Sequence, residues 1–517
     1  MIDQAVSRRS VLAGAAALTL AACGRGDGAP SGLLRVAIDS EPDSLDPLRG
    51  QFASAALLYK QLHAPLTEYS PTGGLAPGLA MTWRSEDARS WRFTLRSGLV
   101  WSDGAPLTAE DVVWTAQRSV DPRTGFADLG DFFAVRGARE ALRGEAPPEA
   151  IGVSAPDERT VIFELDRPVG AFPVLMREFY PLPRHAIEAA PERWTDPAGW
   201  VSAGPYLLKE RGAQRFRLVK NPRFAAADSV TIEEIEIAVI EDSAARARAF
   251  RAGDLDLADR PPPDQIGFYK EALGSLIEGF DAPILTYLKV NCARPGLSDV
   301  RVRRALSLAL DRARLNDVFF DGEATPADRV VPDPDAPPAA PADPDAARTL
   351  LAEAGFGAEN PLSVTLRASA GDRDRLAVAM MDDLQRAGVQ VRLLATYPLD
   401  LYQAVDGGDY DLALGRFDRG MKADPDFMLQ PFMEGGFADN TGWTGPRRIA
   451  FDTLTGEARG TIDAEARAAL LAEAERIFLE EASSIPIAWE KAWWMVSPRV
   501  RTQPGVQPQL WRDLALG

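Results

Sequence analysis

The second half of this chain alternates between strand-like and helix-like segments, and no other feature of the sequence narrows the possible folds as much. Strand-like runs lie at 284–290, 362–368, 389–396, 410–417 and 485–496. Segments with helical spacing of apolar residues lie between them, at 298–310, 343–355, 374–387 and 464–482. Strands that alternate with helices build layered sheets, because the helices cover the sheet faces. The sequence therefore predicts an α/β fold.

The first half contributes shorter elements. A strand is expected at 33–38 and a helix at 53–62, with a turn-rich loop at 41–47 between them. The segment 91–95 alternates as a strand. Thr108 should cap a helix that carries Asp111 in its first turn. A stretch at 331–343 that is rich in Pro and Ala has the composition of a linker.

Charge and composition exclude several classes of protein. The 517 residues imply two to four domains at roughly 100–200 residues each. There are 57 Lys and Arg against 75 Asp and Glu, which gives a formal net charge of −18. Such a surface repels phosphate backbones, so no nucleic-acid partner is expected. His63 and His185 are the only two histidines, which excludes a site that needs several His ligands.

The first 32 residues have the features of an export signal. Arg8 and Arg9 precede an uncharged run at 11–22, whose length as a helix, about 18 Å, is too short for a membrane core of about 30 Å. The segment 7–12 resembles the twin-arginine export motif, and 20–23 resembles a bacterial lipobox. We therefore expect a signal peptide at 1–22, a lipidated Cys23 and a tether at 23–32. Acyl chains would then hold the chain on a lipid bilayer.

With Cys23 lipidated, Cys292 would have no partner for a disulfide. We expect it to be a small buried apolar residue, with a reactive thiol as the alternative.

Motifs of the common catalytic classes are missing from the sequence. No G-x-S-x-G, H-E-x-x-H, C-x-x-C, Walker or G-x-G-x-x-G pattern occurs, and no Ser is followed by Lys three residues later. His63, at the end of an apolar helix, is interpreted as a hydrogen-bonded packing residue, and His185 as a loop residue. The sequence thus disfavours catalysis, and no cofactor or metal site is expected.

Several fragments, in the same order along the chain, carry a resemblance to a known family. They are Glu41-Pro42-Asp43-Ser44-Leu45-Asp46-Pro47 and the segments 77–83, 93–104, 107–112, 204–206, 221–222, 252–256, 299–306 and 350–355. From about residue 33 to the C-terminus, the chain resembles the extracytoplasmic solute-binding proteins of ABC importers, dipeptide/oligopeptide-binding class (solute-binding family 5). Each fragment is weak alone, and their common order gives the resemblance its specificity.

The resemblance implies a two-lobed periplasmic-binding-protein fold, class II-like, with an additional third domain and a hinge between the lobes. By this resemblance, domain I comprises 33–55, 195–275 and 485–517, domain II comprises 56–194, and domain III comprises 276–484. Because the chain crosses between lobes more than once, opening would be a hinge motion between paired segments.

The same resemblance implies candidate ligand contacts. In this family the Asp that binds the peptide amine follows a strand and a Gly-Trp pair and precedes an Asp-Pro, and Asp418 matches that position. Arg416 stands where the family has Trp, and the spacing to Asp424 and Pro425 is about two residues longer. Arg416, Arg419 and Lys422 are therefore alternative contacts for an anionic group, and a solvated charged loop remains the other interpretation.

Three further stretches complete the candidate site. Gln51 and Phe52 join a strand to a helix where the first lobe of the family meets ligand. Arg373 follows a domain III strand where some members keep an Arg that binds a carboxylate. Trp489, near the hinge, either lines the cleft or packs within the protein. Asp103 is interpreted as a turn former.

The function implied is that of a lipid-anchored, monomeric binding protein of the periplasm or cell envelope. It would capture a peptide or a related small solute and deliver it to an ABC permease in the inner membrane, without catalysis. Two alternatives remain open at this point: a sensory or scaffold protein of the same fold, and a secreted hydrolase that uses carboxylates.

Overall fold

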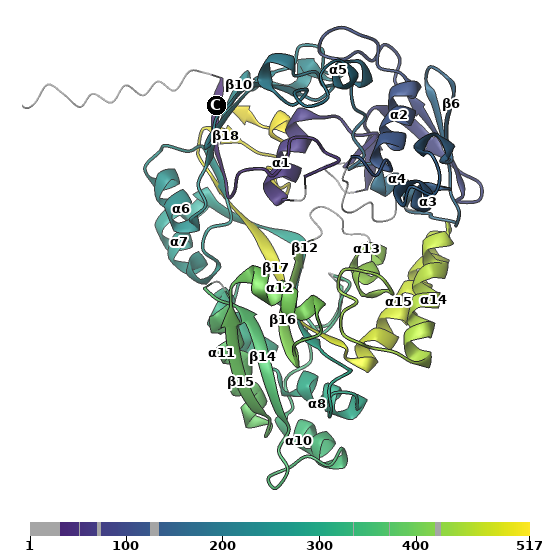
Figure 1. Ribbon diagram of the computed structural model, residues 1–517. Coiled ribbons are helices and arrows are strands. Elements are labelled where there is room, and N and C mark those ends of the chain that lie inside the picture. The colour runs from purple at the N-terminus through teal and green to yellow at the C-terminus, as the bar shows by residue number, and fades with distance from the viewer. Residues whose placement is uncertain are drawn as a thin grey trace, which may run out of the picture.

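The computed structural model describes residues 32–50, 52–69, 74–124, 134–333, 335–371, 373–418 and 425–517. The predicted signal peptide, Cys23 and nearly all of the tether lie outside these ranges. The described elements form two lobes, which two long strands join, β12 (Ile277–Val290) and β17 (Ser484–Val496) (Figure 1). Helices pack around the sheets, so the expected α/β class is confirmed.

One large sheet extends through both lobes. Its strands follow the order β15-β14-β16-β12-β17-β11-β1-β10-β9-β8, and β13 pairs with β17. The upper part contains β1 (Leu33–Ile38), β8 (Tyr206–Arg211), β9 (Arg215–Lys220), β10 (Glu234–Val239) and β11 (Leu257–Asp259). The lower part contains β13 (Thr325–Pro326), β14 (Ser363–Ser369), β15 (Gln390–Thr396) and β16 (Leu412–Asp418). Parallel pairing of β14 with β15 and β16 fits their helical connections.

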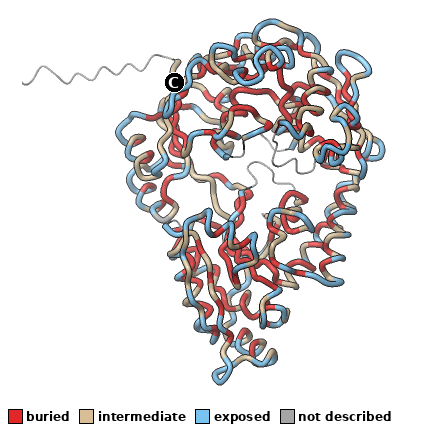
Figure 2. The backbone as a smooth tube through the Cα atoms, in the orientation of Figure 1, coloured by how far each residue is buried: buried red, intermediate tan, exposed pale blue. Residues whose placement is uncertain are grey.

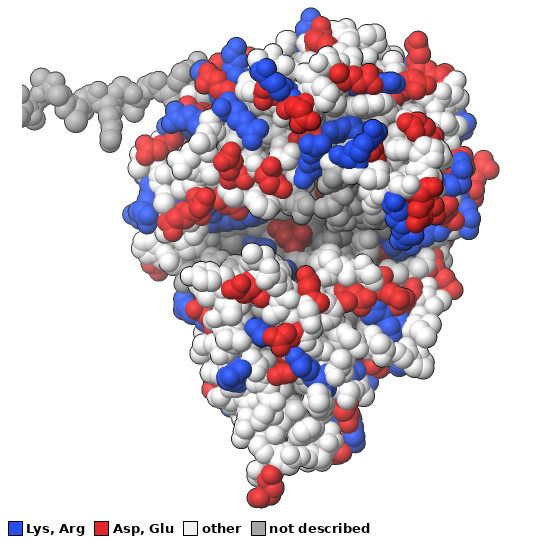
Figure 3. Space-filling view, in the orientation of Figure 1, with Lys and Arg blue, Asp and Glu red and all other residues white. Residues whose placement is uncertain are grey.

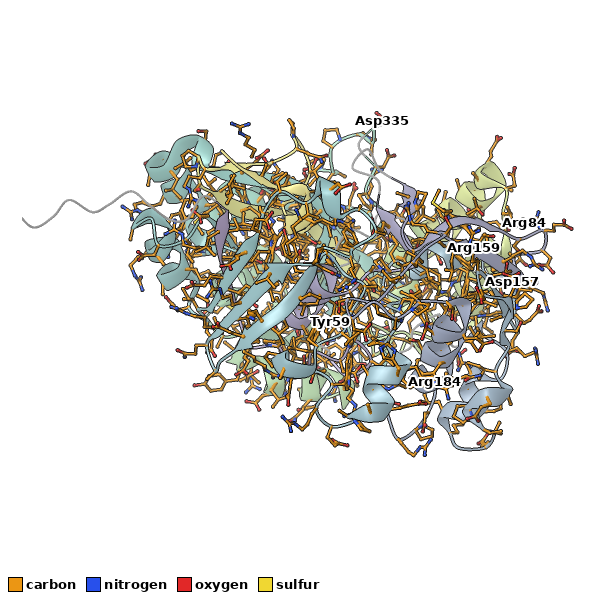
Figure 4. The ribbon with its side chains drawn as sticks, turned by 90° about the horizontal axis from the view of Figure 1, so that it is seen from above. Tyr59, Arg84, Asp157, Arg159, Arg184 and Asp335 are labelled. Atoms are coloured by element: carbon orange, nitrogen blue, oxygen red, sulfur yellow. The ribbon has the colours of Figure 1, made fainter. Side chains whose placement is uncertain are left out.

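A separate four-stranded sheet lies in the upper lobe. It comprises β4 (Ala80–Arg84), β5 (Ser90–Leu95), β6 (Val153–Asp157) and β7 (Thr160–Glu164), in the order β4-β5-β7-β6. Seen from above, Arg84, Asp157 and Arg159 of this sheet and its hairpin lie at one end of the molecule (Figure 4). Two short pairs, β2 (Thr67–Tyr69) with β3 (Leu75–Pro77) and β18 (Val500–Arg501) with β19 (Ala515–Leu516), complete the described strands.

The helices of the upper lobe are α1 (Ala53–Leu62), α2 (Ala109–Ser119), α3 (Ala138–Leu142), α4 (Phe172–Leu175), α5 (Arg184–Ala189), α6 (Ser243–Arg251) and α7 (Ile266–Leu273). Those of the lower lobe are α8 (Val300–Ala309), α9 (Arg312–Phe320), α10 (Pro344–Glu353), α11 (Asp374–Arg386), α12 (Pro398–Asp406), α13 (Pro425–Leu429), α14 (Pro446–Gly460) and α15 (Ala464–Glu481). No helix in the described ranges is long and apolar enough to cross a membrane.

Local signals fix several of these elements. The bounds of β1 and α1 coincide with the expected segments 33–38 and 53–62. At the start of α2, the Thr108 N–H donates a hydrogen bond of 2.9 Å to the Asp111 carboxylate, which satisfies one of the free helix amides. Two expectations were wrong in detail. The strand expected at 284–290 begins seven residues earlier, at Ile277, and His185 lies in α5 rather than in a loop.

Each lobe has its own buried core (Figure 2). In the upper lobe, Leu34 of β1, Phe163 of β7 and Trp511 share one cluster of buried side chains. The segments predicted as domains I and II therefore pack on a common core. The lower lobe has two main clusters, one around Leu366 and Met380 and one around residues such as Phe451. The bounds given above for the three domains stay a prediction.

The two joining strands pass from the upper cores into the lower ones. Ile277 and Met495 pack in an upper cluster, whereas Leu285 and Leu288 belong to lower clusters. Between these points the pairing of β12 with β17 shifts register, from the Asp281–Lys491 pair to the Ile284–Glu490 pair. Because close-packed cores move as bodies, a movement of the lobes would bend the chain at this irregularity.

The lobes also touch on two opposite sides. Beside α7, the Gly267 N–H donates a 3.0 Å hydrogen bond to Asp321, and Lys270 forms an ion pair with Glu323. Beside the C-terminal end of α14, the Gly170 N–H donates a 2.5 Å hydrogen bond to the Arg459 carbonyl oxygen. A Cβ atom at Gly170 would lie 2.9 Å from the Thr461 carbonyl oxygen, so only glycine permits this approach without a shift.

Candidate ligand-binding cleft

A cleft of about 940 Å³ lies between the two lobes. The upper wall comes from α1, from the loop after β1 and from the segment after β11. The lower wall comes from β12, β16 and β17. Figure 3 shows a hollow between the lobes, with acidic and basic side chains along its margins. A concave site of this size fits a ligand larger than a single amino acid.

The lower wall carries two opposite charges on one strand. Arg416 and Asp418 are two residues apart on β16, so both project from the same face of the sheet. Ile284 pairs with Asp418 on one side and with Glu490 on the other, and Thr286 pairs with Arg416. Directly paired residues share a face, which places these side chains together on the wall of the cleft.

Glu490 is the centre of this group. Its side chain is 10% exposed, and its carboxylate lies 2.9 Å from Nη2 of Arg373 and 3.3 Å from Nε of Arg416. Thr286 donates a hydrogen bond to the same carboxylate. Burial opposes the charged form, but the two guanidinium groups and this hydrogen bond outweigh it, and the pKa of Glu490 falls to about 2. Glu490 is therefore ionised at neutral pH.

Arg373 reaches the cleft from the N-cap position of α11. Its Nη1 donates a 2.9 Å hydrogen bond to Thr286, and its Nη2 lies 3.1 Å from the second oxygen of Glu490. The sequence predicted Arg373 and Arg416 as contacts for an anion, and the structure brings both to the cleft. It also places Glu490 between them, a residue that was not predicted from the sequence as part of the site. The available signal was an acid in the middle of the largely apolar segment 484–496.

The upper wall holds a second charged group. Nη1 of Arg260 lies 2.5 Å from Oδ2 of Asp39, and its Nε lies 3.6 Å from Asp259. Burial raises the pKa of Asp259, although Arg260 and Arg246 oppose that rise. Arg260 has a φ of +50°, a left-handed conformation that is uncommon outside glycine. These residues were not among the contacts predicted from the sequence.

The remaining predicted contacts divide into three groups. Phe52 lines the cleft and is 53% exposed. Gln51 and Arg419, with Lys422 and Asp424, lie outside the described residues. Trp489 is absent from the cleft lining and packs against the lower-lobe cluster around Phe451. The reason is strand alternation, since Glu490 points to the cleft and its neighbour must point away.

Both histidines and the second cysteine lie away from this cleft. His63 is buried among the rings of Tyr59, Tyr180, Trp194 and Trp200. His185 contacts Asp103 at 2.7 Å, and Asp103 also accepts a hydrogen bond from the Ala105 N–H, as a turn former does. Cys292 is buried, and burial raises the pKa of its thiol to about 11, which disfavours a reactive thiolate. Among the described residues, no group of three or more His, Cys, Asp or Glu could hold a metal ion.

Comparison with known proteins identifies a family and several relatives to which this chain is similar. The family described as bacterial extracellular solute-binding proteins, family 5 (middle), matches residues 74–440. The periplasmic oligopeptide-binding protein OppA of Escherichia coli is 32% identical over 376 residues, which cover 69% of each chain. The periplasmic murein peptide-binding protein MppA of the same organism is 30% identical over 380 residues, again 69% of each chain.

The fold agrees with these relatives. The unliganded open form of the murein tripeptide-binding protein MppA superposes with a TM-score of 0.79 and 26% identity, covering 94% of this chain and 98% of that one. The two-lobed fold with an additional domain, which the sequence resemblance implied, is thereby confirmed. This chain belongs to family 5 of the bacterial extracellular solute-binding proteins, which are binding components of transport systems and not enzymes.

Proposed function

We propose that this chain captures peptides, or a closely related small solute, between its lobes and delivers them to the membrane permease of an ABC importer. The observation that carries the proposal is the 940 Å³ cleft whose charged walls come from both lobes. A ligand held by both walls stabilises the arrangement in which the lobes touch, because it binds that arrangement better than a separated one. The names of the relatives OppA and MppA support a peptide as the solute.

In this proposal each charged group of a peptide meets a group of opposite charge. Asp418 receives the α-amine, and Arg373 and Arg416 face the acidic side of the ligand. Enclosing a charge in a dry cleft costs several kcal/mol unless it is paired, so these contacts decide whether closure is favourable. Phe52 packs against the ligand from the upper wall, and Gln51 and Arg419 are further contacts in this proposal.

We infer that the chain is exported and lipid-anchored. Arg8 and Arg9 before the uncharged run, and Cys23 after it, support export by the twin-arginine route and acylation of Cys23. Acyl chains contribute about 0.8 kcal/mol for each buried CH₂ group, which is sufficient to hold a monomeric body at the membrane. Mass spectrometry of membrane fractions should then find an acylated N-terminal Cys23, and a Cys23→Ser variant should be released.

Native mass spectrometry of protein purified without refolding tests the function directly. We expect a co-purified peptide that is released intact by unfolding, and small-angle scattering should show a smaller radius of gyration when that peptide is added back. Asp418→Ala should abolish binding of ligands with a free amine, whereas Asp254→Ala, which removes an exposed acid outside the cleft, should preserve it. Cleavage of the peptide, or wild-type affinity in Asp418→Ala, would contradict the proposed role.

A further inference from the structure

Arg416 and Asp418 form a pair of opposite charges with a fixed spacing. Residues two apart on a strand are separated by about 6.6 Å, and both of these face the cleft. Phe417 between them points to the opposite face, where its ring centroid lies 5.6 Å from that of Tyr287. Packing of Phe417 in the lower core therefore holds the two charged side chains in their orientation.

The guanidinium of Arg416 is only partly used by the protein. Its Nε donates a 3.3 Å hydrogen bond to Glu490, and neither Nη nitrogen donates a hydrogen bond to a residue of the described ranges. Arg373 takes the closer position on Glu490, at 2.9 Å, and is 14% exposed, whereas the Arg416 side chain is 34% exposed. Two donor nitrogens of Arg416 thus remain available to a ligand.

The charges in the group around Glu490 balance only as a set. Within this group, Arg373 and Arg416 contribute two positive charges, and Glu490 and Asp418 contribute two negative ones. A ligand that brings only an amine to Asp418 would leave the Nη groups of Arg416 without an acceptor in a closed cleft. Buried donors of a charged group are costly to leave unpaired. A ligand with an amine and a nearby carboxylate satisfies both residues.

We propose, building on the peptide-binding function proposed above, that Arg416 makes this cleft selective for peptides with an acidic side chain at their first or second residue. The spacing of Arg416 from Asp418 corresponds to one or two residues of an extended peptide whose amine is held at Asp418. A guanidinium binds a carboxylate with two parallel hydrogen bonds, which favours Asp or Glu at this position over amides.

Isothermal titration with synthetic tetrapeptides tests this selectivity. Ala-Ala-Ala-Ala, Glu-Ala-Ala-Ala, Ala-Glu-Ala-Ala and the matching Gln peptides are compared for wild type and for Arg416→Gln, Asp418→Asn and Arg392→Gln. Arg392 is an exposed arginine of β15 outside the cleft lining and serves as the matched control. The melting temperature of each variant verifies that it is folded.

Wild type should prefer one Glu peptide over its Gln counterpart by about tenfold to a hundredfold, the usual effect of a hydrogen-bonded charge pair. In Arg416→Gln the Glu peptide and its Gln counterpart should bind with equal affinity. Asp418→Asn should bind both peptides more weakly but keep the preference for Glu, and Arg392→Gln should behave as wild type. Peptide binding without preference for acids, or a preference that survives Arg416→Gln, overturns this inference and leaves the proposed function intact. Failure of every peptide to bind wild type overturns this inference together with the proposal that the solute is a peptide.

Discussion

Replacement of Glu490 by Gln removes a carboxylate that forms ion pairs with both Arg373 and Arg416 on the lower wall of the cleft. The pKa of Glu490 falls from 4.5 to about 2 in the folded protein. At about 1.4 kcal/mol for each tenfold change in proton affinity, this difference corresponds to about 3 kcal/mol of folding free energy. The side chain is only 10% exposed, so solvent screens little of this interaction. We expect Glu490→Gln to lower the free energy of unfolding at pH 7 by about 3 kcal/mol.

The pH dependence of this loss identifies its cause. A carboxylate whose pKa is lowered by folding stabilises the protein above its unfolded pKa, and that stability disappears as the pH falls from about 4.5 to about 2. The difference in the free energy of unfolding between wild type and Glu490→Gln should therefore become smaller as the pH falls from about 4.5 to about 2. Urea unfolding followed by Trp fluorescence at a series of pH values measures it, with Glu278→Gln, an exposed glutamate of β12, as the control. If the two proteins differed in free energy of unfolding by the same amount at pH 2.5 and pH 7, the ion pairs of Glu490 would not be the cause of the difference.

Three further predictions rest on other parts of the structure. Burial lowers the pKa of His63 to about 4, so protonation opposes folding, and about 3 kcal/mol of stability should be lost as the pH falls from about 6.5 to 4. His63→Phe should remove that loss in the same urea titration, and an unchanged acid profile would exclude His63 as its source. Burial also lowers the pKa of Lys289 to about 8, so the stability of wild type should rise between about pH 8 and 10.5, and Lys289→Met should abolish that rise. Gly170→Val would place a Cβ 2.9 Å from the Thr461 carbonyl oxygen, and scattering should then show lobes that no longer approach as they do here. Scattering identical to that of wild type would show that the chain around Gly170 and Thr461 accommodates the larger side chain without separating the lobes.

The sequence predicted elements well where short-range signals define them. The helix at 53–62 and the strand at 33–38 were expected at their observed bounds, and α10 begins at Pro344, next to the Asp343 cap that the sequence contains. Helix caps and the period-two alternation of strands involve only residues close together in the chain, so they can be recognised from the sequence alone. The first seven residues of β12 were missed, since Glu278, Gly279 and Asp281 break the apolar pattern where the strand passes between lobes.

The same distinction between local and long-range signals applies to the residues of the candidate cleft. The sequence by itself determined which charged residues lie on or just after the lower-lobe strands, including Arg416 and Asp418 of β16 and Arg373 after β14. Only the tertiary structure brought Glu490 to them, across 117 positions from Arg373 and 74 from Arg416. Such a contact depends on strand order and on the register of β12 between β16 and β17, which no local propensity encodes. For the same reason Trp489 and Glu490, neighbours in sequence, lie on opposite faces of one strand, the first in the core and the second in the cleft.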